Sequence, residues 1–130
     1  MIYVYAVSIP ANTPKTAPLV QDLQLSAGTI TRVNVQFPSG VTALAHVQLR
    51  LGLFQIYPTN PDGDFASSNE TIAWDEEFTL DTGSNVMTFI GWNTDTVYSH
   101  TIAVRVIIQP KITVADLSQE IALLLAQNSV

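Results

Sequence analysis

Hydrophobic and polar residues alternate along most of the first 110 positions, with the period of two that is typical of half-buried β-strands. The clearest run covers 98–108, where Ile102, Val104 and Val106 share one predicted face. The same alternation occurs in 29–37, 45–51 and 74–80, and shorter candidate strands cover 2–8, 18–25, 53–57 and 86–92. The pattern predicts about eight strands.

Turn-forming residues separate these segments, among them Ala27 and Gly28, Pro38 to Gly40, and the stretch 81–85. The longest connection covers 58–68. Antiparallel strands at this spacing favour an all-β fold, a jelly-roll-like antiparallel β-sandwich of about eight strands. An immunoglobulin-like sandwich is the alternative, but the Cys pair that would favour it is missing.

The period changes after Pro110, where a strand pattern gives way to a helical one. Thr113 can cap the helix, and Asp116 lies in its first turn, where a carboxylate interacts favourably with the helix dipole. We therefore expect a β-sandwich domain over 1–110 and one C-terminal amphipathic α-helix over 111–130.

The predicted helix has an apolar face that needs a partner. Its core positions follow a 3-4-3 spacing, and they are Val114, Leu117, Ile121 and Leu124. Leu123 and Leu125 are expected to widen the face. A helix this short is marginal unless the face is buried, so it either lies on the sheet of its own domain or bundles with helices from other copies. The sequence leaves both options open.

The chain carries unusually little charge. Charged residues make up 12% of the sequence, against about 25% in a typical soluble domain. No apolar run approaches the roughly 18 residues of a membrane span, so no membrane association is expected. Because interface cores are depleted in Lys, Glu and Asp, the low charge predicts a surface covered by copies of the same chain. A trimer is the favoured state, with other particle proteins as further partners.

The remaining composition narrows the function classes. The net charge is −6 and the five basic residues are scattered singly, which argues against nucleic acid as a partner. There is no Cys, so disulfides, thiolate metal sites and Cys nucleophiles are excluded. The start of the sequence lacks a basic n-region and a signal-cleavage site, so we expect a product made in the cytoplasm.

Candidate catalytic residues are few. His46 lies on the polar face of its predicted strand and His100 on the apolar face of another, so the two imidazoles are not expected to converge. Asp75 and Glu77 share one face of a strand about 7 Å apart, whereas a glycosidase pair comes from separate elements. Since no hydrolase, phosphate-loop or metalloprotease motif is present, we expect no enzyme, cofactor or metal site.

Two ligand hypotheses remain beside this expectation. The loop from Asn60 to Asp64 resembles part of a calcium loop, but position 71, where the bidentate Glu would stand, is Thr. Trp74, Trp92 and Tyr57 could line a sugar-binding platform, which makes a carbohydrate-binding β-sandwich module the alternative function. That alternative requires the three rings to be exposed and coplanar in one groove.

Glu76 is unusual because it falls on the same predicted face as Trp74 and Phe78. A charged residue on an apolar face needs a compensating partner. Glu76 is therefore expected either at a strand end or opposite an Arg from another subunit.

Four segments carry a resemblance to a known group. They are 9–14, 28–33, 57–63 and 91–93, beginning Ile9-Pro10, Gly28-Thr29, Tyr57-Pro58 and Gly91-Trp92. In order and spacing the chain resembles small, mostly uncharacterised β-sandwich structural proteins of phage and virus-like gene clusters, over roughly residues 7–110. The resemblance implies a virion component, such as a decoration, spike-base or minor capsid protein, and supplies no catalytic or ligand residue.

Taken together, these features predict a structural subunit of a symmetric protein assembly, a phage virion component, that acts through protein–protein contacts. The candidate oligomer interface is Val114, Leu117, Ile121 and Leu124. The candidate partner-contact loop contains Tyr57, Asn60, Asp62 and Phe65.

Overall fold

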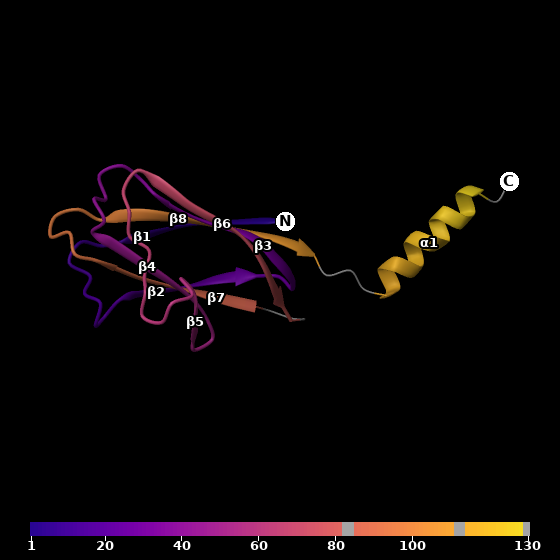
Figure 1. The fold of residues 1–130 in the computed structure, drawn as a ribbon, viewed down its shortest axis with the longest axis horizontal. Coiled ribbons are helices and arrows are strands. Elements are labelled where there is room, and N and C mark those ends of the chain that lie inside the picture. The colour runs from indigo at the N-terminus through magenta and orange to yellow at the C-terminus, as the bar shows by residue number, and fades with distance from the viewer. Residues whose placement is uncertain (82–84, 111–113, 129–130) are drawn as a thin grey trace.

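The computed structural model describes residues 1–81, 85–110 and 114–128, apart from the side chains of 114–116 and 128. This part of the chain forms eight strands and one helix (Figure 1). The elements are β1 (Ile2–Ile9), β2 (Leu19–Leu25), β3 (Gly28–Phe37), β4 (Ala45–Leu51), β5 (Phe54–Tyr57), β6 (Glu70–Leu80), β7 (Asn85–Asn93), β8 (His100–Pro110) and α1 (Val114–Asn128). The predicted capping residue Thr113 lies outside the described residues.

The strands form two antiparallel four-stranded sheets that pack face to face, in the orders β1-β8-β3-β6 and β2-β7-β4-β5. Strands from opposite ends of the chain are neighbours, since β8 lies between β1 and β3 while β7 lies between β2 and β4. This interleaved order is that of an eight-stranded jelly roll. The predicted all-β sandwich is confirmed.

The core lies between the inner faces of the two sheets. Alternation on β8 buries Ile102, Val104, Val106 and Ile108, and β6 faces the same interior less completely through Trp74 and Phe78. The side chains that fill the centre are apolar in the described part: Val7, Ile9, Leu23, Ile30, Val33, Val35, Phe37, Leu49, Met87 and Phe89 are almost completely buried. Burial of this apolar surface is the main force that holds the two sheets together.

The structure corrects one predicted strand face. The pairing of β3 with both of its neighbours shifts register between Ile30 and Arg32, which marks a β-bulge. The alternation through 29–37 places Thr31 and Val33 on the same predicted face, but in the structure Ile30 is the buried residue and Thr31 is only half-buried. The Thr31 hydroxyl instead donates to the carbonyl of Ile107, 3.3 Å away.

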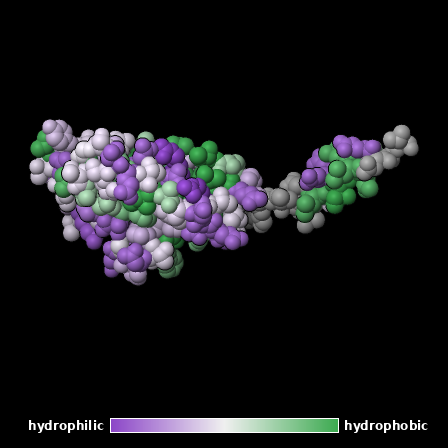
Figure 2. All heavy atoms as spheres, turned by 45° about the horizontal axis from the view of Figure 1, so that its top comes forward, coloured by the Kyte–Doolittle hydropathy of each residue, from purple (hydrophilic) through white to green (hydrophobic). Residues whose placement is uncertain are grey.

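The helix α1 follows the last strand and stands apart from the sandwich in Figure 1, with no extensive contact to any strand. Every described side chain from Leu117 to Gln127 is exposed. Figure 2 shows hydrophobic surface along one side of the helix. The exposed fractions of Leu117, Ile121, Leu124 and Leu125 are 47%, 56%, 54% and 65%. The helix therefore does not lie on its own sheet. Within the described ranges, no helix has the length and apolarity to span a membrane.

Candidate functional site

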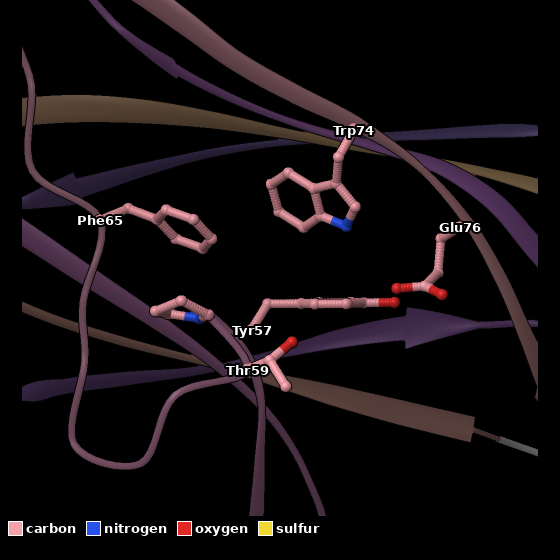
Figure 3. Close-up of a pocket in the computed structure, with 6 residues that line it drawn as sticks. Tyr57, Thr59, Phe65, Trp74 and Glu76 are labelled. Carbon is pink, nitrogen blue, oxygen red and sulfur yellow. The ribbon is translucent and has the colours of Figure 1, made fainter.

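A pocket of about 220 Å³ opens at one edge of the sandwich, between the edge strands β5 and β6 of the two sheets. Figure 3 shows the side chains that line it pointing toward one another from both sheets. The lining residues are Tyr57, Pro58, Thr59, Phe65, Trp74 and Glu76. Three of the six are aromatic and one is acidic.

Strand alternation explains how β6 supplies two of these residues. Its inward-facing positions recur every second residue, which places Trp74 and Glu76 on the pocket side and leaves Asp75 and Glu77 exposed. Tyr57 ends β5 and faces them from the opposite sheet. Because β5 is short, the edge of its sheet beyond Tyr57 is completed by the connecting loop.

That loop is fastened to the sheet at Phe65. The backbone of Phe65 forms an isolated antiparallel bridge with Val47 of β4, with hydrogen bonds of 3.0 and 2.9 Å in the two directions. Nearer its start, the loop is held by Gln55, whose side-chain amide donates to the carbonyls of Pro58, Asn60 and Gly63. The aromatic wall contributed by the loop therefore has a defined position.

The three aromatic rings meet at Trp74. Its centroid lies 5.0 Å from that of Tyr57, with the planes at 62°, and 5.2 Å from that of Phe65, with the planes at 23°. Both distances are within the range of favourable aromatic pairs. The rings pack against one another across the gap between the sheets and form the apolar walls of the pocket.

The polar groups that line the pocket do not all have hydrogen-bond partners. Burial, and after it the negative charge of Glu76, raises the pKa of Tyr57 well above its usual range, so the hydroxyl keeps its proton. Tyr57 is only 4% exposed, and its hydroxyl meets no neighbour in full hydrogen-bonding geometry, although Glu76 and Trp74 both lie close enough to influence its pKa (Figure 3). An unsatisfied buried hydroxyl is costly in free energy, so such groups call for an explanation.

Glu76 accepts one hydrogen bond, from the backbone N–H of Glu77 at 3.0 Å. No ion pair involves Glu76 within residues 1–81, 85–110 and 117–127. The expectation that Glu76 sits at a strand end is wrong, since it lies inside β6 with four residues of the strand after it.

The four residues of the predicted partner-contact loop do not form one surface. Asn60 and Asp62 are exposed at the tip of the loop, whereas Tyr57 is buried and Phe65 is half-buried in the pocket wall. Sequence reasoning grouped them because they are close along the chain. The structure instead joins Tyr57 and Phe65 with Trp74 and Glu76 of a distant strand.

The two imidazoles lie in separate places, as their opposite strand faces predicted. His46 Nδ1 is 2.6 Å from Asp64 Oδ1, and His100 Nε2 is 2.8 Å from Asp95 Oδ2. Asp75 lies apart from both imidazoles and pairs with Arg32 at 2.6 Å on the exposed face of its sheet.

The geometry required for a sugar-binding platform is not met. Trp92 is 5% exposed and lies against His46, away from the pocket. Tyr57 and Trp74 do share the pocket, but their planes are far from parallel and Tyr57 is buried. The three rings therefore do not form one exposed, coplanar surface.

The described residues contain no cluster of three or more His, Cys, Asp or Glu side chains that could hold a metal ion. In the loop that resembles part of a calcium site, Asp64 is engaged by His46, while Gly63 donates its backbone N–H to the carbonyl of Asn60 at 3.0 Å. The Asn60 side chain packs against Gly63.

Of the predicted interface residues, Leu117, Ile121 and Leu124 are exposed on α1, and the side chain of Val114 lies outside the described residues. No protein-family model matches the sequence, and no curated protein has significant sequence similarity to it.

Proposed function

We propose that this chain is a structural subunit of a symmetric homo-oligomer whose copies associate through α1. The single observation that carries the proposal is the uncovered apolar face of the helix. Leu117, Ile121 and Leu124 are each about half exposed, and the sandwich of the same chain does not cover them. A short helix with such a face is stable in water when another apolar surface covers it.

The spacing of the apolar residues favours other helices as that surface. Leu117, Ile121 and Leu124 follow the 4-3 spacing of core positions in a coiled coil, and Leu125 lies beside them on the same face. Leu123 is two residues beyond Ile121 and hence about 160° away around the helix. The expectation that Leu123 widens the apolar face is therefore wrong, although Leu125 does widen it.

A second copy of this chain is the partner that best fits the distribution of charged residues on α1. The helix contains Asp116 and Glu120 and has no basic residue. In a parallel coiled coil, the position occupied by Glu120 lies opposite that of Leu125 on the next helix, so the acidic side chains are kept apart. Parallel helices also place all sandwich domains at one end, as cyclic symmetry requires.

We favour three copies. Ile121 and Leu124 in the core positions are compatible with two-stranded coils, but Leu125 makes the apolar face wider than a two-stranded seam. A third helix covers that flank. Since the helix is short, contacts between sandwich domains are expected to add to the interface.

In a cell, this subunit would be a component of a virus-like particle, in the role of a decoration, spike-base or minor capsid protein and in contact with other particle proteins. The jelly-roll order of the strands is compatible with that role, since viral capsid domains use it. Lectin domains and cupins use it too, so the role rests on the uncovered helix and the resemblance together, and not on the fold.

Light scattering of the purified chain tests the proposal, with Leu117→Asp/Ile121→Asp as the disrupting variant. The matched control is Leu123→Asp, which introduces a charge on the other side of the same helix. We expect a trimeric mass for the parent and the control, and a monomeric mass for the double variant with an unchanged strand signal in circular dichroism. A monomeric parent chain would refute the proposal.

A further inference from the structure

The pocket between β5 and β6 contains a carboxylate for which the described residues supply no cation. Four of the five basic residues of the chain lie in this part and are engaged elsewhere. Lys15 lies over Trp92, Arg32 pairs with Asp75, Arg50 donates to Gln48, and Arg105 donates to Gln36. A partly buried carboxylate is stabilised by an opposite charge, so Glu76 favours a cationic ligand.

The walls of the pocket favour the same kind of ligand. Tyr57, Phe65 and Trp74 surround the space in front of Glu76 (Figure 3). Aromatic rings attract cations through their quadrupole, and Trp does so most strongly. They also exclude water, which strengthens the attraction between a carboxylate and a bound cation.

The hydroxyl of Tyr57 restricts the chemical class of the ligand further. It is buried beside Glu76 and Trp74, and no neighbour meets it in full hydrogen-bonding geometry, so it can turn its O–H toward the carboxylate and accept from a ligand. Together with the carboxylate it provides two acceptors at one end of the pocket. A cation that carries several N–H donors satisfies both, which a quaternary ammonium cannot do.

The size of the pocket limits the ligand to a small group. Sites for drug-sized molecules usually measure about 300–1,000 Å³, whereas this pocket measures about 220 Å³. It suits a charged head on a short alkyl stem.

We propose that this pocket binds an alkylammonium or guanidinium group, with Glu76 and the Tyr57 hydroxyl as acceptors for its N–H donors. The aromatic rings hold the alkyl stem. Such a group occurs in free small amines and at the ends of Lys and Arg side chains. The proposal is independent of helix-mediated assembly, because the pocket is formed by the sandwich alone.

Titration of the full chain with n-butylammonium chloride, followed by the indole N–H signals in NMR spectra, tests this proposal. The chain has two Trp residues, and a Trp74→Phe variant assigns their signals. We expect a saturable shift of the Trp74 signal, with a dissociation constant of about 1 mM or above. The signal of Trp92, which is buried elsewhere, should not move.

1-Butanol is the neutral comparator, because it has the same stem without the charge and requires no variant to fold. Glu76→Gln should weaken butylammonium binding about tenfold or more, since a hydrogen bond to a charged group is lost. Glu77→Gln is the matched control on the exposed face of the same strand and should bind as the parent does. Equal binding of butanol, unchanged binding by Glu76→Gln, or no shift of Trp74 would each overturn the proposal.

A second pair of probes identifies the source of the group. Tighter binding of N-acetyl-lysine methylamide than of butylammonium would support a side chain of another protein as the occupant. Tighter binding of butylammonium would support a free amine. Failure of both, with the assembly intact by light scattering, would refute the pocket proposal and leave the assembly proposal standing.

Discussion

His46 of β4 and Trp92 of β7 are cross-strand partners whose rings stack in parallel, with centroids 5.3 Å apart and planes 3° from coplanar. They lie on the outer face of their sheet, since Val47 is buried in the core and the Cα of Gly91 faces the core residues Ile9 and Phe89. Asp64 from the long loop holds the imidazole, and Lys15 lies 5.2 Å from the centroid of the indole ring. This arrangement explains how a Trp on an outer face is almost completely buried.

We predict that this stack couples the two residues energetically. His46→Ala and Trp92→Leu should each lower the free energy of unfolding in urea. The double variant should lose less than the sum of the two, by about 0.5–1.5 kcal/mol, because the ring pair can be removed only once. Losses that add to within about 0.3 kcal/mol would show that the stacking contributes nothing beyond burial.

Asn93 joins three segments of chain, and its replacement should be strongly destabilising. Its buried amide donates to the carbonyls of Ile9 and Tyr98, and its side-chain oxygen accepts from the N–H of Asp95. Asn93→Ala leaves these groups without partners and should cost about 2–4 kcal/mol of unfolding free energy.

The neighbouring Thr94 is the control for that variant. Its hydroxyl donates to the carbonyl of Leu44 at the exposed surface, where water can replace it. Thr94→Ala should therefore cost less than about 1 kcal/mol in the same urea experiment. Equal losses for the two variants would contradict the anchoring role of Asn93.

Asp95 is expected to make stability depend on acid pH. Hydrogen bonds from the backbone N–H groups of Val97 and Tyr98, and after them the contact with His100, lower the pKa of this carboxyl below its ordinary value. Because the pKa is lowered in the folded state, the stabilisation is present above the ordinary Asp value of about 4 and is lost as the pH falls through the folded value.

Asp95→Asn tests this dependence. At neutral pH the variant should unfold at a lower temperature than the parent, since the charge on the acceptor is gone. The difference between the two melting temperatures should shrink as the pH is lowered below about 4, where the parent carboxyl takes up its proton. A difference that stays constant down to pH 2 would show that the ionised carboxylate is not responsible.

Gly28 occupies a position that only Gly fits. Its φ is +150°, and a Cβ there would lie 2.3 Å from the carbonyl oxygen of Gln109 on the neighbouring β8. Gly28→Ala should cost more than the roughly 1–3 kcal/mol of backbone strain alone, because the two strands must also separate.

Gly40 is a control that distinguishes the cost of backbone strain from the cost of steric overlap. Its φ is +90°, but nothing lies within 4 Å of the position that a Cβ would take. Gly40→Ala should therefore lose only the strain contribution in thermal or urea unfolding. If it proves as destabilising as Gly28→Ala, close approach of β8 is not what requires Gly at position 28.

Much of the strand pattern could be predicted from the sequence because each strand has one face toward a single core. The alternation through Ile102, Val104 and Val106 is a local property of the chain, and the structure confirms it. The ends were harder to place. The alternation suggested that β8 begins at Tyr98, but Asp95 accepts from the N–H groups of Val97 and Tyr98, so these residues belong to a turn and β8 begins at His100.

The pocket could not be predicted as a site because its residues come from strands that pair with different neighbours. Tyr57 and Glu76 are brought together by the position of β5 and β6 at the same edge of two sheets, which depends on the whole topology. The one feature of the sequence that pointed to this site was Glu76, a charged residue on an otherwise apolar strand face. The start of β6 at Glu70, four residues before the predicted one, likewise depends on pairing with the distant end of β3.

The interleaved strand order has a consequence for how the chain folds during synthesis. The strands inserted between others, β7 and β8, are the last to be made, so β2 has no strand to pair with until residue 93 has been made and β1 has none until residue 110, although β3 can pair with β6 earlier. Partners so distant in sequence close slowly, on the order of milliseconds to seconds. Nascent chains should thus remain sensitive to protease until β8 emerges and then become resistant in one step, without a folded N-terminal half.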